Sequence, residues 1–233
     1  MRLSRAITVK INRVLDEWIP PVMRDARILF PQVFRLLFRQ HADAFRTFKE
    51  RAPRMTDTDY AAVYHAVDPV LMKRETDLSE ESIRAIQDSL VGTTVLEVGC
   101  GHGYLSGILA RNHPVTATDM QVRASVRQAY PNVTFTEARM EQIPFADASF
   151  DTVICTHTLE HAPYFMQSTS ELRRVARKRL IIVVPRQRPY RYTFDLHLHF
   201  FPYPHSLLLA LNAPGVRHRC EIIGGDLFYV QDF

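Results

Sequence analysis

A glycine-rich segment preceded by an acid is the part of this sequence best suited to bind a nucleotide-like ligand. Glycines stand at the alternate positions Gly99, Gly101 and Gly103, directly after the apolar run Thr94–Val98, which contains Glu97. Glycines leave no Cβ in the way of a ligand, and free N–H groups at the start of a following helix would face it. The pattern therefore predicts a strand, a tight loop and a helix around a ligand.

Two acids indicate what kind of ligand this is. Glu97 lies at the end of a predicted buried strand, where a carboxylate is costly unless it meets hydrogen-bond donors. An ammonium group or ribose hydroxyls would supply donors, whereas a phosphate would repel Glu97. Asp119 lies 22 residues further on, at the end of the predicted strand 115–119, where an acid can accept hydrogen bonds from ribose. The spacing G-x-G-x-G also differs from the dinucleotide fingerprint G-x-G-x-x-G.

Three stretches resemble the class I S-adenosylmethionine (SAM) methyltransferases, nearest to those that act on ubiquinone and other small molecules. They are E-V-G-C-G-H-G from Glu97, I-P-F from Ile143, and the block from Phe150 that contains F-D-T-V and L-E-H. The resemblance covers about residues 92–185. It implies an α/β fold with a doubly wound, mostly parallel seven-stranded sheet that ends in an antiparallel hairpin. We expect that hairpin around Gly224-Gly225-Asp226, and we expect S-adenosyl-L-methionine as cofactor.

The resemblance also implies which residues bind the cofactor. In similar methyltransferases, a Tyr and an Arg upstream of the glycine loop cover the methionine end and hold its carboxylate. Tyr64 and Arg74 are the candidates here; alternatively, Arg74 pairs with Glu75 or Asp77 and Tyr64 is a half-buried spacer. The full set of expected cofactor-binding residues is Glu97, Gly99, Gly101, Gly103, Asp119, Met120, Met140, Thr156, Tyr64 and Arg74.

Position 139 departs from the family pattern. The family usually carries an Asp there that meets the adenine amine, but Arg139 cannot accept a hydrogen bond. Adenine recognition would then fall to the Met140 backbone and to apolar contact. This change is the main support for a rival interpretation, in which the chain binds SAM as a regulatory or scaffold protein without catalysis.

His157 and His161 are the expected catalytic residues. They follow the predicted strand 150–156, at the carboxyl edge of the sheet where ligands bind. Histidine can act as a base near neutral pH, which methyl transfer to a hydroxyl requires. The alternatives are that His161 is structural or lines the cofactor pocket, and that His157 only packs beside the methionine tail.

The segment after Pro185 is expected to form a cap over the acceptor. Asp195, His197 and His199 have a spacing that could ligate a metal, but we expect no metal site. The expected cap residues are Tyr190, Tyr192, His197, His199, Phe200 and Phe201.

The first part of the chain differs in composition from the rest. No glycine precedes Gly92, which predicts a helical arm over residues 1–91 and a SAM-binding domain over 92–233. We expect arm helices over 4–18, 21–39, 42–49, 56–65, 69–73 and 79–90. Residues 1–54 carry 12 Lys or Arg against 5 Asp or Glu, whereas the remainder carries 17 against 20.

The segment Ile28–Arg39 is the most apolar part of this arm and is interspersed with arginines. It fits either a surface packed on the body or on a second subunit, or a helix lying on a membrane surface. Nucleic acid is an unlikely partner, because clustered basic runs and the N/D-P-P-Y/F motif of base methyltransferases are absent.

The cysteine pattern and the lack of long apolar runs indicate in which cellular compartment the protein is expected. Cys100, Cys155 and Cys220 have no disulfide-framework or metal spacing. We expect a cytoplasmic protein without signal peptide or transmembrane helix, with peripheral contact to the inner membrane face as an alternative. The expected function is methyl transfer to a small-molecule, saccharide or lipid-linked acceptor, at oxygen.

Overall fold

The computed structural model describes residues 14, 18–24, 42–71, 75–189, 191 and 195–233, and these form two compact units. Unit 1 contains the described residues up to Glu75 together with those of Gln187–Phe200. Unit 2 contains Thr76–Arg186 and Phe201–Phe233. The boundary expected after residue 91 falls within unit 2, because helix α6 (Glu80–Asp88) packs on its sheet through Ile86.

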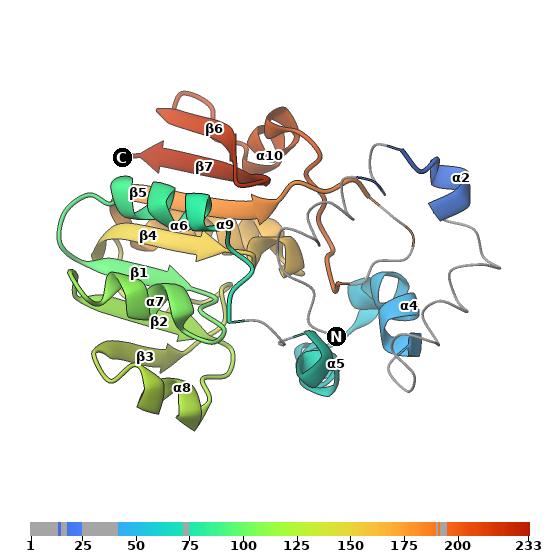
Figure 1. Cartoon of the computed structure of the whole chain (residues 1–233), viewed down its shortest axis with the longest axis horizontal. Helices are drawn as coiled ribbons and strands as arrows, with labels where there is room; N and C mark the ends of the chain where they lie inside the picture. The colour runs from blue at the N-terminus through green and yellow to red at the C-terminus, as the bar shows by residue number, and fades with distance from the viewer. Residues whose placement is uncertain (1–13, 15–17, 25–41, 72–74, 190, 192–194) are drawn as a thin grey trace. The chain divides into compact units, whose positions relative to one another are not determined.

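A seven-stranded sheet forms the centre of unit 2, in the order β3-β2-β1-β4-β5-β7-β6 (Figure 1). The strands are β1 (Val95–Val98), β2 (Val115–Asp119), β3 (Val133–Glu137), β4 (Phe150–Thr156), β5 (Ala176–Pro185), β6 (His218–Ile223) and β7 (Asp226–Asp232). Strands β1 to β5 pair in parallel, and β7 is antiparallel to both β5 and β6. This confirms the doubly wound sheet with a final antiparallel hairpin.

Helices cover both faces of the sheet because its strands are apolar on both sides. One buried cluster joins Val95, Ala117 and Ile154 of the strands to α6 and α7 (Tyr104–Leu109). The opposite cluster joins Leu96, Val98 and other strand residues to α9 (Phe165–Val175) and α10 (Pro204–Leu211) (Figure 1). The strand order reverses between β1 and β4, and the crevice at their carboxyl ends is where such sheets bind ligands.

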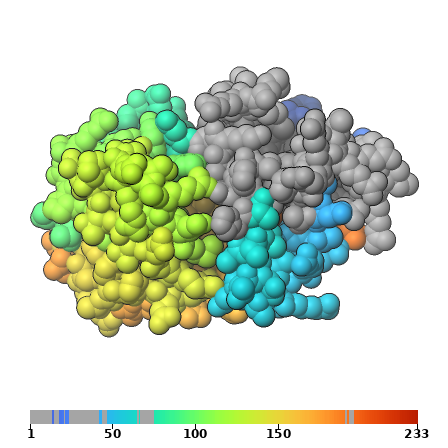
Figure 2. Space-filling model, turned by 90° about the horizontal axis from the view of Figure 1, so that it is seen from below, coloured from blue at the N-terminus to red at the C-terminus, as the bar shows by residue number. Residues whose placement is uncertain are grey.

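Helix α8 (Ala124–Ala129) lies near the β3 edge of unit 2 (Figure 1). In Figure 2, which is seen from below Figure 1, the yellow-green atoms of this region lie on the surface of unit 2. Strand β3 is one of the two edge strands of the sheet, and Val133 is its buried residue.

Unit 1 contains α2 (Pro21–Arg24), α4 (Ala42–Arg51), the 3-10 helix η2 (Ala52–Arg54) and α5 (Asp57–Leu71). The helix expected over 42–49 is confirmed. The separate helices expected over 56–65 and 69–73 are wrong in part, because α5 continues through Pro69 to Leu71 as one helix. Phe48, Tyr60 and Leu196 form a small buried core.

Several expected arm segments cannot be compared with the structure. Residues 4–13, 25–39 and 72–74, and with them the segment Ile28–Arg39, lie outside the described residues. Among the helices that the structure does describe, none is both long enough and apolar enough to cross a membrane.

Candidate cofactor and active site

The loop from Gly99 to Gly103 connects β1 to α7 and has the conformation that its glycines permit. Gly99, Gly101 and Gly103 all have positive φ, at 79°, 51° and 71°. The N–H groups of Gly99 and Cys100 donate to the Thr118 carbonyl at 2.7 and 3.0 Å. A Cβ on Gly99 would overlap the hydroxyl of Thr158. The loop therefore passes closely between β2 and the segment that follows β4.

Glu97 lies on the α7 face of the sheet, because side chains alternate along β1 and Val95 points the same way. Its carboxylate accepts a hydrogen bond from the hydroxyl of Ser106, on α7. Burial raises the pKa of Glu97 to about 7, against a smaller opposing effect of the Ser106 hydrogen bond. A buried carboxylate with this pKa would gain from a ligand that brings positive charge or hydroxyl donors.

Asp119 ends the neighbouring strand β2 and faces the same loop. Its Oδ2 accepts a hydrogen bond of 2.8 Å from the N–H of Gly101, and its Oδ1 accepts one of 3.4 Å from Gln121. Burial raises the pKa of Asp119, although these backbone donors oppose the effect. Because Val98 pairs with Thr118 in parallel register, the two acids lie at the carboxyl ends of adjacent strands.

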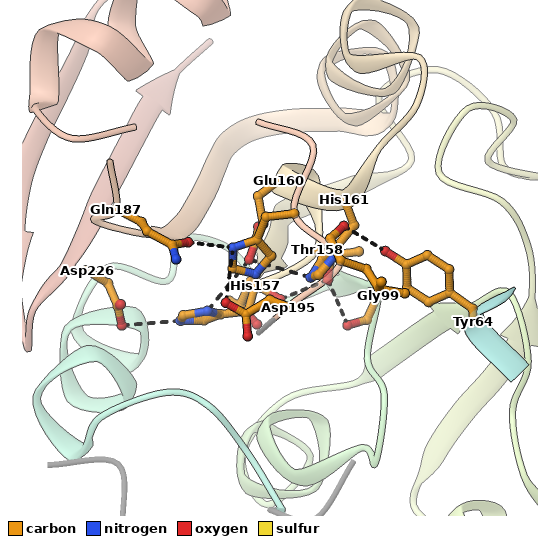
Figure 3. A network of polar contacts seen from close by, with 12 residues as sticks. Tyr64, Gly99, His157, Thr158, Glu160, His161, Gln187, Asp195 and Asp226 are labelled. Atoms are coloured by element: carbon orange, nitrogen blue, oxygen red, sulfur yellow. Dashed lines mark hydrogen bonds and ion pairs between the residues drawn. The ribbon is translucent and has the colours of Figure 1, made fainter. Parts of the chain in front are cut away.

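The segment after β4 brings His157 to the same edge of the sheet (Figure 3). His157 has a φ of 47°, and its N–H donates to the Val183 carbonyl at 2.9 Å. Its Nε2 lies 3.2 Å from Oδ2 of Asp226, and its Nδ1 lies 3.7 Å from Oε1 of Glu160. The next residue, Thr158, places its hydroxyl 3.2 Å from the Gly99 carbonyl, which joins this segment to the glycine loop.

The other expected site residues of unit 2 lie on different elements and differ in burial. Thr156 ends β4 and is buried, and Met120 follows Asp119 with 40% of its surface exposed. Met140 packs in the cluster that contains Leu96 and Val98. His161 ends the 3-10 helix η3 (Leu159–His161), with its Nε2 3.9 Å from Oε1 of Glu160.

Tyr64 belongs to unit 1, and Arg74 lies outside the described residues. The Tyr64 ring packs 4.9 Å from that of Tyr60, and the two hydroxyls are 3.2 Å apart. The contacts of Tyr64 within unit 1 make it part of the small core around Phe48. Its role toward a cofactor, like that of Arg74, stays a prediction.

The expected acceptor cap is divided by the structure. His197 and Phe200 belong to unit 1, where His197 Nδ1 lies 2.7 Å from Oε1 of Gln187. Phe201 instead packs in the core of unit 2, 5.9 Å from the ring of Phe165. Its role toward an acceptor stays a prediction. Tyr190 and Tyr192 lie outside the described residues.

Position 139 does not offer an acceptor in place of the family's Asp. Arg139 Nε lies 3.3 Å from a carboxylate oxygen of Glu141, and a bridge joins Arg139 to Gln142. The guanidinium is thus engaged locally.

Four residues contribute to the site in ways that sequence reasoning missed: Ser106, Thr158, Glu160 and Asp226. Glu160 stands in the L-E-H stretch and Asp226 in the predicted hairpin turn, so both were visible as residues. Their contacts with His157 were not, because they depend on how β4, η3 and β7 meet.

The geometry fits a nucleoside ligand with a positively charged part. The glycine loop passes so close to Thr158 that a side chain at Gly99 would overlap it. The buried carboxylate of Glu97 and the half-buried carboxylate of Asp119 flank the loop, and each has a pKa raised by burial. Such acceptors match hydroxyl donors and a cation, and they disfavour phosphate.

Comparison with known proteins gives the same result. Residues 96–184 match the family model described as a methyltransferase domain. A phthiotriol/phenolphthiotriol dimycocerosates methyltransferase of Mycobacterium tuberculosis is 34% identical over 100 residues, which are 40% of this chain and 37% of that protein. The chain thus matches well under half of that relative's length.

Solved structures share the fold. A SAM-dependent methyltransferase from Aquifex aeolicus aligns with a TM-score of 0.53 and 20% identity, over 75% of this chain and 97% of that one. The [4+2]-cyclase SpnF aligns with a TM-score of 0.55 and 17% identity, over 71% and 75% of the two chains. These likenesses show the fold alone. The sheet order, the glycine loop between two acids and the matched segment together show that the chain carries a class I SAM-dependent methyltransferase domain, a family whose cofactor is S-adenosyl-L-methionine.

Proposed function

We propose that this chain transfers a methyl group from SAM to a hydroxyl group of a small-molecule or lipid-linked acceptor. The observation that supports it most is the pair of carboxylates, the buried Glu97 and the half-buried Asp119, on either side of a positive-φ glycine loop. A dinucleotide site has little use for a buried acid before its first glycine. A SAM site does, because the ligand is cationic and offers ribose hydroxyls.

Different residues contact different parts of the cofactor in this proposal. Asp119 accepts hydrogen bonds from the ribose hydroxyls, and Glu97 complements the positive charge of the methionine part. Gly99, Gly101 and Gly103 let the backbone approach, while the Met140 backbone and the Met120 side chain contact the adenine. Tyr64 and Arg74 cover the methionine end in this scheme.

The protein has to supply a base for one proton and to hold the acceptor in place. When bound, SAM supplies a methyl group on a positively charged sulfur, and its transfer to a hydroxyl oxygen releases one proton. His157 takes this proton, because it lies at the carboxyl end of β4 beside the glycine loop and is only partly exposed, at 13% of its side chain. His161, one turn further on, lines the acceptor side. Holding the acceptor beside the methyl group supplies the rest of the acceleration.

A lipid-linked acceptor is supported by one relative and by the sequence of the arm. The relative's name assigns it phthiotriol and phenolphthiotriol dimycocerosates as substrates. The segment Ile28–Arg39 of this chain combines Phe and Leu with arginines, as helices at a membrane surface do. We propose that it holds the protein at a lipid surface.

Methyl transfer is tested with SAM that carries tritium in its methyl group. Purified protein incubated with a lipid extract should move the label into the organic phase and release S-adenosylhomocysteine. His157→Ala should slow this at least a hundredfold, and His218→Ala, at an exposed histidine of β6, should not. Label that stays with SAM in every extract and every hydroxyl acceptor contradicts the proposal.

The lipid surface is tested separately by flotation with vesicles that contain anionic lipid. The full chain should float with the vesicles, and the variant with both Leu36→Glu and Leu37→Glu should remain in the dense fraction. Equal flotation of the two proteins contradicts the membrane role of this segment.

A non-catalytic SAM-binding protein is the second candidate, because Arg139 replaces the family's acid and is engaged by Glu141. The same fold also serves a [4+2]-cyclase. Binding of SAM without any methyl transfer would favour this alternative.

A further inference from the structure

We infer that Asp226 is a positioning residue for His157, an inference that rests on the proposed function. Asp226 is the first residue of β7, and 1% of its side chain is exposed. Its Oδ2 lies 3.2 Å from Nε2 of His157, across 69 residues of sequence (Figure 3). A buried carboxylate at this distance needs a donor, and the imidazole N–H is one.

This contact decides which ring nitrogen can act as a base. A carboxylate only accepts hydrogen bonds, so Nε2 carries the proton of the neutral ring and Nδ1 keeps the lone pair. As the acceptor oxygen bonds to the methyl carbon and the carbon–sulfur bond breaks, the hydroxyl proton adds to Nδ1. The imidazolium that results lies between Asp226 and Glu160, whose Oε1 is 3.7 Å from Nδ1. Both carboxylates stabilise that product, and Asp226 does so through a hydrogen bond.

The backbone at His157 also indicates a residue held for function. Its φ of 47° is in the left-handed region, which is unfavourable for a residue with a Cβ. The hydrogen bond from the His157 N–H to the Val183 carbonyl and the contact of its ring with Asp226 hold this conformation. Strained residues of this kind gather at functional sites.

Asp226 is itself held in place by the hairpin. Its backbone pairs with Pro185 of β5 and with Ile223 of β6. The Ser82 hydroxyl, in α6, donates to the Ile223 carbonyl at 3.3 Å, and a Cβ on Gly224 would overlap the Ser79 hydroxyl. The start of α6 thus fixes the turn that presents Asp226 to His157.

The titratable side chains that face His157 within unit 2 include Asp226 of β7 and Glu160 of η3. His161 lies on the far side of Glu160, 3.9 Å from the same oxygen. Of these, Asp226 is the one within hydrogen-bond distance of the His157 ring.

The test is nitrogen NMR of the full chain labelled with ¹⁵N in its histidine rings. In the wild-type protein, neutral His157 should carry its proton on Nε2. Asp226→Asn keeps the shape but removes the charge, and it should lower the titration midpoint of His157 by about one pH unit. Asp232→Asn, at the other end of β7 where Asp232 pairs with Arg179 at 2.7 Å, should leave the midpoint unchanged.

A wild-type neutral ring protonated on Nδ1 would overturn the inference without any variant. So would equal midpoints in wild type and Asp226→Asn. The Gly224→Ala variant provides a second check, because it should displace the turn that presents Asp226. It should therefore also lower the titration midpoint of His157.

The activity measurement separates this inference from the proposed function. With a hydroxyl acceptor, Asp226→Asn should move the acidic limb of the kcat/KM profile to lower pH and reduce kcat about tenfold or more. Binding of S-adenosylhomocysteine should not change. If the acidic limb of the kcat/KM profile stays at the same pH in Asp226→Asn, the role of Asp226 is overturned. Absence of turnover by the wild type would instead contradict the proposed function, and the NMR comparison would then decide the role of Asp226.

Discussion

At the scale of residues, the chemistry of this site depends on acids that are hard to ionise. Glu97 and Asp119 are carboxylates whose pKa values burial raises. In water both would be charged well below neutral pH. Their placement beside a glycine loop makes them sensitive to any ligand that supplies donors or positive charge.

The pKa of Glu97 predicts a pH-dependent stability. In the unfolded chain Glu97 ionises near its ordinary value of 4.5, whereas in the folded protein it holds its proton to about 7. Its contribution to stability is therefore full below pH 4.5 and is lost as the pH rises through 7. Glu97→Gln should remove this loss, so the free energy of unfolding of the variant relative to wild type should rise by up to about 3 kcal/mol across that window.

The measurement is denaturant unfolding of the ligand-free protein at pH 4.5, 6 and 7.5. Glu221→Gln, at an exposed position of β6, is the control and should keep the wild-type pH dependence. A stability difference for Glu97→Gln that does not change with pH would contradict the assigned pKa.

Gly99 offers a prediction about close approach. Gly99→Ala should cost several kcal/mol of folding free energy and remove SAM binding, because its Cβ would overlap Thr158. Gly215 has a similar φ of 74°, but a Cβ added there would meet no atom within 4 Å. Gly215→Ala should therefore cost only about 1 kcal/mol from backbone strain. Equal costs in denaturant unfolding would show that overlap with Thr158 is not the cause.

At the scale of elements, the carboxyl ends of β1, β2 and β4 carry the site, and their amino ends are fixed separately. Asp151 of β4 accepts hydrogen bonds from the N–H groups of Thr93 at 2.8 Å and Thr94 at 3.3 Å. Lys178 and Arg177 lie 3.0 and 3.1 Å from its other oxygen. This arrangement attaches the turn before β1 to β4 and β5.

Asp151→Asn should lower stability at neutral pH. The backbone donors and Lys178 hold the pKa of Asp151 well below its usual range. Its contribution is therefore present above the ordinary value of 3.8 and is lost as the pH falls below it. Thermal melting should show a gap between variant and wild type at pH 7 that narrows toward pH 2.5. Asp147→Asn, at a carboxylate 80% exposed, should melt like wild type at pH 7.

Elements near the glycine loop are predictable because they depend on local patterns. The strand 115–119 and the glycine turn of the final hairpin follow from short apolar runs bounded by turn residues. The start of helix α9 at Phe165 is hard to predict, since Phe165–Ser170 mixes polar and apolar residues without a start signal. The continuation of α5 through Pro69 contradicts the usual interpretation of proline as a break.

At the scale of the whole molecule, contacts between distant segments are beyond sequence reasoning. Glu97 and Asp119 can be assigned because their spacing matches adjacent strands. The pairing of His157 with Asp226 cannot, because it requires the register of β5, β7 and β6. The assignment of Gln187–Phe200 to unit 1 and of Phe201 to unit 2 likewise depends on packing.

Calorimetric titration of the folded protein with S-adenosylhomocysteine tests the central claim most directly, because it needs no acceptor. We predict micromolar binding by wild type, a loss of at least tenfold in affinity for Asp119→Ala, and no loss for the exposed control Asp147→Ala. No binding at millimolar ligand by folded protein, or equal affinity of wild type and Asp119→Ala, would contradict a SAM site between Glu97 and Asp119.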